Sequence, residues 1–317
     1  MNLRAFCFTL LSTIAISIAV GLPAQAQRAR VFVASYGNNA NPCTFLSPCR
    51  TFQVALSAVA PGGEITAIDS AGFGPLNIDK AVTVTSPQGI EAGVVAAGNG
   101  DAIDINAGPN DSIVLRNLTL EGGGTGTFGI YLTAAGRLEI ENCTVHNFAA
   151  NGINLSPTTA LTTLIANSVV TDIFGQAFAV ILNSQGGPIG ASLSNVTLGH
   201  SHYGLVVEAN NGAVEALVSN SHFDNNIDTG LFAQGNSGDS MVSVVLRNVT
   251  LNQNVHGVLA SSYSSIWMSG VTQASVLPVT DGINFAGGFA THVYVDGTNH
   301  IMSGVTGFGT LESWPSQ

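Results

Sequence analysis

Polar and apolar positions repeat along this chain every 25 or 28 residues, and the most regular polar position is an asparagine. The asparagine recurs at Asn117, Asn142, Asn167, Asn195, Asn220 and Asn248. Self-similarity at such a period is typical of solenoids, in which each repeat buries its apolar side only by stacking on its neighbours. The pattern therefore predicts a stack of coils rather than a globular domain.

Around each asparagine, apolar and polar residues alternate with the period of two that indicates a β-strand. Three positions are mostly apolar and are predicted to face the interior: two before the asparagine (Leu115, Ile140, Ile165, Leu193, Val218, Leu246), one after it (Leu118, Cys143, Ser168, Val196, Ser221, Val249) and three after it (Leu120, Val145, Val170, Leu198, Phe223, Leu251). The position two after the asparagine is usually threonine and is predicted to face outward. Cys143 is therefore expected to be a small buried thiol without a partner.

A second repeated position, a small residue followed by an apolar one, predicts the start of another strand: Gly129-Ile130, Gly152-Ile153, Ala177-Phe178, Gly204-Leu205, Gly230-Leu231, Gly257-Val258 and Gly282-Ile283. Glycine there indicates either a positive φ or restricted space. At the first position, asparagine tolerates the left-handed geometry of a tight turn, and its amide can bond to the asparagines above and below. We expect these amides to form an internal ladder in a stack of about nine coils between residues 64 and 305.

Residues 1–26 carry the features of a secretory signal peptide: Arg4, the apolar run from Ala5 to Val20, and the small-residue end Ala24-Gln25-Ala26. The run is shorter than the roughly 20 residues that a transmembrane helix needs. The sequence therefore predicts an exported protein without a transmembrane segment, periplasmic or extracellular, with cleavage before Gln27.

Residues 27–63 are predicted to form an N-terminal cap on the stack. Arg30 to Ser35 is expected to be a strand, and Cys43 and Cys49 are expected to form a disulfide in an oxidising compartment. The apolar residues from Thr51 to Val59 have helical spacing, and Pro61-Gly62-Gly63 is expected to end that helix. Residues 64–305 are then the solenoid, and residues 306–317 a C-terminal tail.

The charge balance is strongly acidic, with 8 lysines and arginines against 19 aspartates and glutamates. Nucleic-acid binding requires clustered cations, whereas the arginines here are scattered and Lys80 is the single lysine, so nucleic acid is excluded as a partner. Arg116 and Glu141 occupy neighbouring positions in adjacent coils, and we expect an exposed ion pair between them.

With these columns in view, residues 64–305 resemble the right-handed parallel β-helix proteins of the pectin-lyase-like superfamily. The stretch Val31 to Asn39, with Pro42-Cys43 and Pro48-Cys49-Arg50-Thr51-Phe52, is similar to the cap of exported bacterial β-helix proteins of uncharacterised function. The resemblance implies an all-β, right-handed parallel β-helix with a short N-terminal capping helix. The superfamily includes polysaccharide lyases, glycoside hydrolases, esterases, phage tailspikes and adhesins, so the fold alone does not select an activity.

The chemistry of the familiar enzymes of this superfamily is not evident in the outward columns. One column reads Asp104, Tyr131, Asn154, Ala179, Val206, Phe232, Leu259 and Asn284, and the other reads Val114, Glu139, Leu164, Ser192, Leu217, Val245 and Trp267. Calcium needs six to eight oxygen ligands, and glycoside hydrolases need paired carboxylates. Neither column supplies these groups, so we predict no metal and no cofactor.

The strongest polar constellation is His202, Asp228 and His256, which lie just before the second repeated position in successive coils. Stacking is predicted to bring them within a few ångströms, where they could exchange protons or, together with His200 on the same strand face, bind a metal. The alternative is that polar residues near a turn satisfy one another in solvent.

The outer columns also carry apolar side chains, including Tyr131, Phe232 and Trp267, which would stack on a sugar ring or a partner unless loops of the chain cover them. Two functions follow. The first is a secreted, non-catalytic β-helix that binds a polysaccharide or a cell-surface protein along an outer wall. The second is a polysaccharide lyase or glycoside hydrolase with an atypical site at His202, Asp228 and His256.

Overall fold

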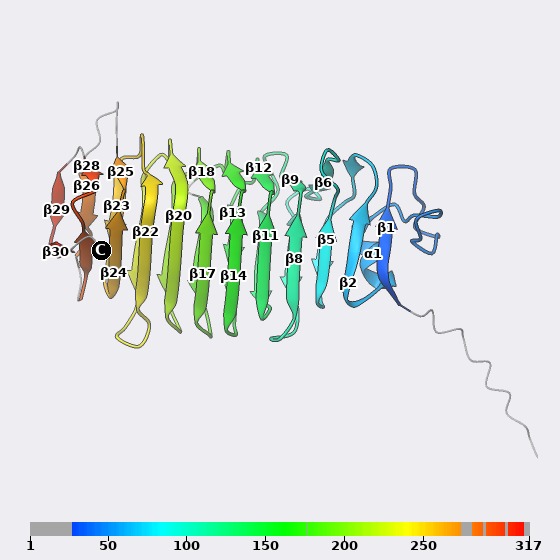
Figure 1. Cartoon of the computed structure of the whole chain (residues 1–317), viewed down its shortest axis with the longest axis horizontal. Helices are drawn as coiled ribbons and strands as arrows, with labels where there is room; N and C mark the ends of the chain where they lie inside the picture. Colours follow the sequence, from blue (N-terminus) through cyan, green and yellow to red (C-terminus); the bar gives the residue numbers. More distant parts are fainter. Residues whose placement is uncertain (1–26, 176, 274–280, 288–289, 302–303, 314–317) are drawn as a thin grey trace, which may run out of the picture.

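The strands stack side by side along one long axis, as Figure 1 shows in a computed structural model, from β1 (Arg28–Val33) at one end to β30 (Thr310–Ser313) at the other. The structure describes residues 27–175, 177–273, 281–287, 290–301 and 304–313. The ladders between successive coils are parallel. The predicted all-β parallel solenoid is therefore confirmed, whereas the predicted signal peptide lies outside the described residues.

Three walls of parallel strands enclose the interior. In the described part of the chain, two of them belong to one 20-stranded sheet and the third is a separate sheet of ten strands. The long wall contains β1, β2 (Val59–Ala67), β5 (Val82–Thr85), β8 (Ser112–Arg116), β11 (Arg137–Glu141), β14 (Leu161–Ala166), β17 (Ile189–Ser194), β20 (Val214–Asp224), β22 (Val242–Thr250), β24 (Ser264–Ser269), β27 (His292–Val295) and β30.

The short wall continues the long wall past a corner, and β20 and β22 run through that corner without interruption. It contains β3 (Ala71–Gly72), β6 (Ala92–Val95), β9 (Leu118–Glu121), β12 (Thr144–His146), β15 (Val169–Thr171), β18 (Thr197–Gly199), β25 (Thr272–Gln273) and β28 (His300–Ile301). The ten-strand wall contains β4 (Leu76–Ile78), β7 (Ile103–Asn106), β10 (Phe128–Ala134), β13 (Asn151–Leu155), β16 (Phe178–Ser184), β19 (Tyr203–Ala209), β21 (Thr229–Gly235), β23 (His256–Ala260), β26 (Asp281–Phe285) and β29 (Val305–Gly307).

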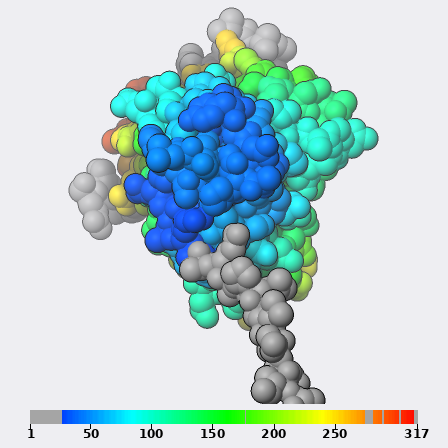
Figure 2. Space-filling model, turned by 90° about the vertical axis from the view of Figure 1, so that its right-hand side faces the viewer, coloured from blue at the N-terminus to red at the C-terminus, as the bar shows by residue number. Residues whose placement is uncertain are grey.

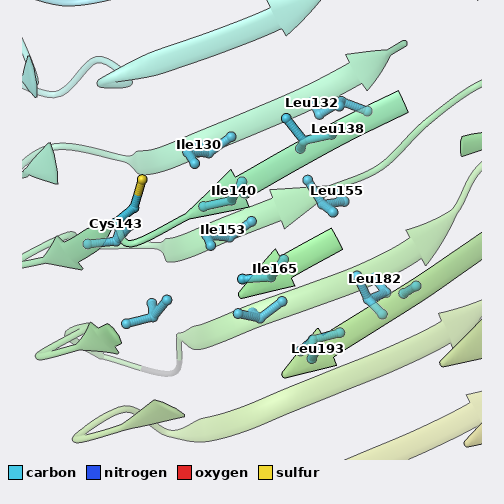
Figure 3. Close-up of a cluster of buried hydrophobic side chains, with 14 of the residues drawn as sticks. Ile130, Leu132, Leu138, Ile140, Cys143, Ile153, Leu155, Ile165, Leu182 and Leu193 are labelled. Atoms are coloured by element: carbon cyan, nitrogen blue, oxygen red, sulfur yellow. The ribbon is translucent and has the colours of Figure 1, made fainter. Parts of the chain in front are cut away.

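The core is a column of apolar side chains that runs the length of the solenoid. Leu138, Ile140, Ile165 and Leu193 from the long wall meet Ile130, Ile153, Leu155 and Leu182 from the ten-strand wall (Figure 3). All the predicted interior positions beside the asparagines are buried. Cys143 is among them, and burial raises the pKa of its thiol to about 12, so the thiol is an inert packing group.

The repeated asparagines form the corner between the long and short walls, each with a left-handed φ of 50° to 55°. This confirms the predicted turn geometry. The expectation of an internal ladder is wrong, because the corner lies at the surface and five of the six asparagines are exposed. Side-chain bonds join Asn195 to Asn167 at 2.8 Å and Asn248 to Asn220 at 3.2 Å.

A buried polar ladder lies six residues after the corner, where earlier coils place the buried side chains of Phe148 and Ile173. Ser201 Oγ donates to Asn226 Oδ1 at 2.7 Å, and Asn226 Nδ2 donates to Asn254 Oδ1 at 3.0 Å. All three residues are at most 3% exposed. The carbonyls and amides of the adjacent turns bond to this ladder, so the polar groups are satisfied inside the core.

The glycines of the second repeated position are required by restricted space rather than by a positive φ. A Cβ on Gly129 would lie 2.4 Å from Val145 Cγ1, and one on Gly152 would lie 2.3 Å from Val170 Cγ1. These glycines therefore let the chain bend against the core at the start of each strand of the ten-strand wall.

One predicted register is wrong. Val180, not Phe178, pairs with Ile153, so Ala179-Val180 stands where Ala177-Phe178 was expected. Ala179 is consequently buried, and Ile181 takes its predicted place in the outward column beside Asn154. A slip of two residues preserves the alternation of inward and outward positions, so the apolar pattern could not reveal it.

The N-terminal cap combines a strand, a disulfide loop and a helix. β1 pairs with β2, so the cap region also supplies the first strand of the long wall. The predicted Cys43–Cys49 disulfide is present, and the segment it closes bonds to the free edge of β1 through Phe32 N to Cys43 O (2.9 Å) and Cys49 N to Phe32 O (3.0 Å).

Helix α1 (Phe52–Ala58) covers the end of the core, with Thr51 as its N-cap and with Phe52, Ala55 and Leu56 buried. It ends one residue earlier than predicted, because Val59 is already extended and starts β2. At the other end of the solenoid, β29 and β30 still pair with β26 and β27, so strands continue past residue 305. Among the described residues, none of the helical segments has the length and apolarity to cross a bilayer.

Candidate functional site

The structure brings the three predicted polar residues together on the outside of the ten-strand wall. His202 and Asp228 immediately precede β19 and β21, and His256 is the first residue of β23. Asp228 lies between the two imidazoles, with Oδ2 4.0 Å from His202 Nδ1 and Oδ1 3.7 Å from His256 Nε2. The three side chains are partly buried.

Asp281 extends this group by one coil, and sequence reasoning missed it. Its Oδ2 lies 3.6 Å from His256 Nδ1, and Asn284 Nδ2 donates to the same oxygen at 3.3 Å. We call His202, Asp228, His256 and Asp281 the polar row. The signal was available in the sequence, because Asp281 precedes Gly282 just as His256 precedes Gly257.

Tyr203 connects the polar row to an aromatic surface. Its ring centroid lies 4.8 Å from that of His202, 5.4 Å from that of Phe178 and 6.1 Å from that of Phe232. Burial, together with a hydrogen bond to Asp228 and the charge of that carboxylate, raises the pKa of Tyr203 to about 12. The hydroxyl is therefore protonated at neutral pH and serves as a hydrogen-bond donor.

The polar row can exchange protons and bind hydroxyl groups, but its geometry does not favour a metal. Within the described parts of the chain, no three His, Cys, Asp or Glu side chains are arranged to hold a metal ion. The predicted partnership of His200 with His202 is wrong, because His200 lies in a turn with a φ of 51° and its Nδ1 is 3.3 Å from Asp172 Oδ1. His202 Nδ1 is buried and makes no hydrogen bond to any described group.

The three predicted aromatic binding residues do not form one site. Tyr131 and Phe232 share an outward column of the ten-strand wall but lie four strands apart, and Tyr131 packs on Phe128 with the ring centroids 4.9 Å apart. Trp267 lies on the long wall, where its indole stacks on the ring of Tyr294 with centroids 5.1 Å apart and planes 9° apart.

The long wall carries a depression outside β14, β17, β20 and β22, which we call the trough. It has a volume of about 440 Å³ and is lined by Thr162, Thr163, Gly190, Ala191, Ser192, Glu215, Ala216, Leu217, Ser243 and Val245. Gly190 contributes to the hollow because a Cβ added to it would meet no atom within 4 Å. Leu217 and Val245 belong to the same outward column as Trp267 and Tyr294, so the trough leads to the aromatic pair.

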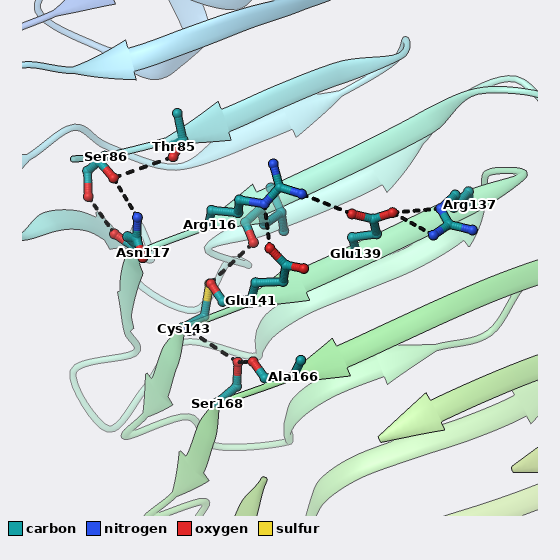
Figure 4. Close-up of polar contacts among 11 residues, drawn as sticks. Thr85, Ser86, Arg116, Asn117, Arg137, Glu139, Glu141, Cys143, Ala166 and Ser168 are labelled. Atoms are coloured by element: carbon teal, nitrogen blue, oxygen red, sulfur yellow. Dashed lines mark hydrogen bonds and ion pairs between the residues drawn. The ribbon is translucent and has the colours of Figure 1, made fainter. Parts of the chain in front are cut away.

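Arg116 and Arg137 of the long wall are engaged with carboxylates rather than directed into the trough. Arg116 contacts Glu141 through Nε at 2.5 Å and Glu139 through Nη2 at 3.2 Å, and Arg137 contacts the other oxygen of Glu139 at 2.6 Å (Figure 4). The predicted pair is therefore part of a four-residue network. Its members are partly exposed, so each contact contributes about 0–1 kcal/mol to stability.

Comparison with known proteins agrees with this architecture. The family described as the right-handed β-helix region matches residues 82–213. The chain is a right-handed parallel β-helix with the pectin-lyase-like fold. No curated protein matches this β-helix protein by sequence.

Among solved structures, the β-helix protein is similar to a pectate lyase, Pel9A, at 14% identity, covering 89% of this chain and 78% of that one with a TM-score of 0.61. It is also similar to an alginate lyase from Paenibacillus sp. str. FPU-7, at 14% identity, covering 89% of this chain and 99% of that one with a TM-score of 0.61. A rhamnogalacturonan lyase is similar at 12% identity, covering 80% of this chain and 75% of that one with a TM-score of 0.55. At such low identity the likeness is one of fold.

Proposed function

We propose that this β-helix protein is exported and binds a polysaccharide along the trough of the long wall without cleaving it. The observation that carries the proposal is the alignment of an open trough with the Trp267–Tyr294 pair in a single outward column. The structurally similar lyases are named for polysaccharides, which supports this class of ligand.

The lining of the trough suits a sugar chain. Thr162, Ser192 and Ser243 supply hydroxyl groups, and Leu217 and Val245 supply apolar contact. Tyr294 covers one face of the Trp267 indole, and Trp267 is only partly buried, so the exposed part of its ring can stack on a sugar ring.

The charge of the trough favours a neutral polysaccharide. Among the described residues that line it, Glu215 is the one with a charge, and the chain as a whole has 19 acidic against 8 basic residues. A polyuronate would therefore be repelled. A single carboxylate also falls short of the pair that glycoside hydrolysis requires, which supports binding without cleavage.

The test is retention of the mature chain on immobilised neutral and acidic polysaccharides, with reducing ends and unsaturated products measured in the same samples. Gly190→Leu should fill the trough without disturbing the fold, because its Cβ has open space, and should abolish retention. Trp267→Ala should weaken retention about tenfold, as expected for loss of a stacked aromatic. Tyr131→Ala, an aromatic control on the ten-strand wall, should bind like the wild type. Unchanged binding by Gly190→Leu would refute the proposal.

Catalysis at the polar row is a second candidate, favoured by the position of Asp228 between two imidazoles at 3.7 Å and 4.0 Å. Proton transfer by such a group would require a polysaccharide to lie across β19, β21 and β23. This candidate predicts product release that is lost in Asp228→Asn and His202→Ala and retained in Gly190→Leu. Absence of product from every polysaccharide, together with retention on one of them, would exclude it in favour of binding.

A further inference from the structure

The charges of this protein are separated between its two ends. Residues 27–63, the N-terminal cap, contain Arg28, Arg30 and Arg50 and neither aspartate nor glutamate. All 19 acidic residues lie between positions 64 and 317, together with only four basic ones. The cap therefore carries a charge of +3 and residues 64–317 a charge of −15, so the molecule has a basic end and an acidic body.

The cap also presents apolar side chains at the tip of the loop from Cys43 to Cys49. Leu46 is 89% exposed and Phe45 is 59% exposed, so both project from the surface, and Tyr36 on the neighbouring turn is 69% exposed. Figure 2 views the molecule from this end, where the cap covers the first coils.

This exposure is built into the loop. The disulfide closes the loop, and Thr44 and Ser47 exchange two backbone hydrogen bonds of 3.1 Å across its tip. The ring of Phe45 packs edge-on against Phe32 of β1, with centroids 5.5 Å apart. A tip held by these contacts cannot fold its apolar side chains back into the core.

Two of the cap arginines flank the tip. Arg28 and Arg30 are exposed on β1, on the same strand face as Phe32. The guanidinium of Arg28 donates to the carbonyl of Pro42, the residue just before the loop. Arg30 pairs with Glu64 at 3.0 Å and keeps 60% of its side chain exposed.

We propose that the cap docks on an anionic lipid bilayer, with Phe45 and Leu46 inserted among the headgroups and Arg28 and Arg30 beside the phosphates. A rigid apolar projection flanked by cations fits the boundary between headgroups and acyl chains. A protein partner is a poorer fit, because a stable protein interface needs about 800 Å² of complementary surface on each side, whereas the apolar part of the cap is a narrow tip. The acidic body is repelled by the same surface, so the solenoid stands on its cap.

The test is co-sedimentation of the mature chain with vesicles of phosphatidylglycerol mixed with phosphatidylcholine. The chain starts at Gln27, so that the preceding apolar run is absent. Vesicles of phosphatidylcholine alone provide the comparison. We expect binding to the anionic vesicles that weakens as salt is raised, and little binding to the zwitterionic ones. Absence of wild-type binding to the anionic vesicles would overturn the proposal.

Matched variants locate the contact. Arg28→Gln with Arg30→Gln should reduce the affinity about 30-fold, at about fivefold for each arginine, and Phe45→Ser with Leu46→Ser should reduce it about tenfold or more. The control variants lie away from the cap. Arg247→Gln changes an exposed arginine of the body, and Phe308→Ser changes a phenylalanine that is 90% exposed at the opposite end. Both variants should bind the anionic vesicles like the wild type. Equal losses in the control variants, or capture of an acidic protein with no vesicle binding, would refute the proposal.

Discussion

The buried polar ladder provides a sharp test of how this solenoid is held together. In the variant Asn254→Leu, the new side chain has nearly the same size but no polar atoms. Asn254 Oδ1 accepts from the backbone N–H of Asn226 at 3.0 Å, and Asn254 Nδ2 donates to the carbonyl of Phe223 at 2.7 Å. The substitution leaves both backbone groups buried without these partners. Since each such group costs about 1–3 kcal/mol, the expected loss in the free energy of unfolding is about 2–6 kcal/mol.

The assay is denaturation by guanidinium followed by far-UV circular dichroism, together with amide hydrogen exchange of β20 and β22. The control is Asn195→Gly, which removes an exposed corner bond of 2.8 Å and leaves a residue that adopts the left-handed φ freely. We expect the control to lose no more than about 1 kcal/mol. The ladder is not the source of this stability if Asn254→Leu unfolds at the same guanidinium concentration as the wild type, or if Asn195→Gly lowers the free energy of unfolding as much as Asn254→Leu does.

Three further outcomes follow from buried groups. Gly152→Ala should cost about 1–3 kcal/mol in thermal denaturation, because its Cβ would lie 2.3 Å from Val170 Cγ1, whereas Gly238→Ala, with open space around its Cβ, should be neutral. Burial raises the pKa of Glu208, so the stability that its protonated form provides is lost as pH rises through the folded-state pKa. Glu208→Gln should therefore have a higher melting temperature than the wild type at pH 7. This difference in melting temperature should vanish below pH about 4, where the glutamate is protonated in both the folded and the unfolded state. The Cys143 thiol, with its pKa near 12, should resist iodoacetamide in the native protein at pH 8 and react after unfolding, as mass spectrometry would show.

The sequence specified the repeat, the corner and the interior columns because strand periodicity ties each residue to one face. It did not specify which polar positions are buried. The corner asparagines recur strictly and yet lie at the surface, whereas Asn226 and Asn254 are buried in a column where Phe148 and Ile173 precede them. A polar residue replacing an apolar one in a column was the available signal. The register at Ala179 could not be predicted, because turn length varies between coils and a slip of two residues leaves every side chain on the same face.

The candidate sites depended on information that a linear pattern holds only in part. Alignment of the coils was enough to place His202, Asp228 and His256 near one another, and the same rule would have added Asp281. The trough could not be predicted, because it arises from the missing side chain of Gly190 between larger neighbours on adjacent strands. The alignment already placed Tyr131 and Phe232 in one outward column and Trp267 in the other, and the structure assigns these columns to the ten-strand wall and the long wall.

The cap and the trough lie far enough apart on the solenoid to act independently. Six strand spacings separate β1 from β17, which at about 4.8 Å each place the trough about 29 Å from the cap. That distance is about three Debye lengths at 0.1 M salt, so the field of an anionic bilayer would not reach a ligand bound there. Polysaccharide retention should therefore be unaffected by Phe45→Ser with Leu46→Ser, and vesicle binding should be unaffected by Gly190→Leu. Loss of both activities in either variant would mean that the cap and the long wall act as a single surface, which a rigid solenoid standing on its cap does not allow.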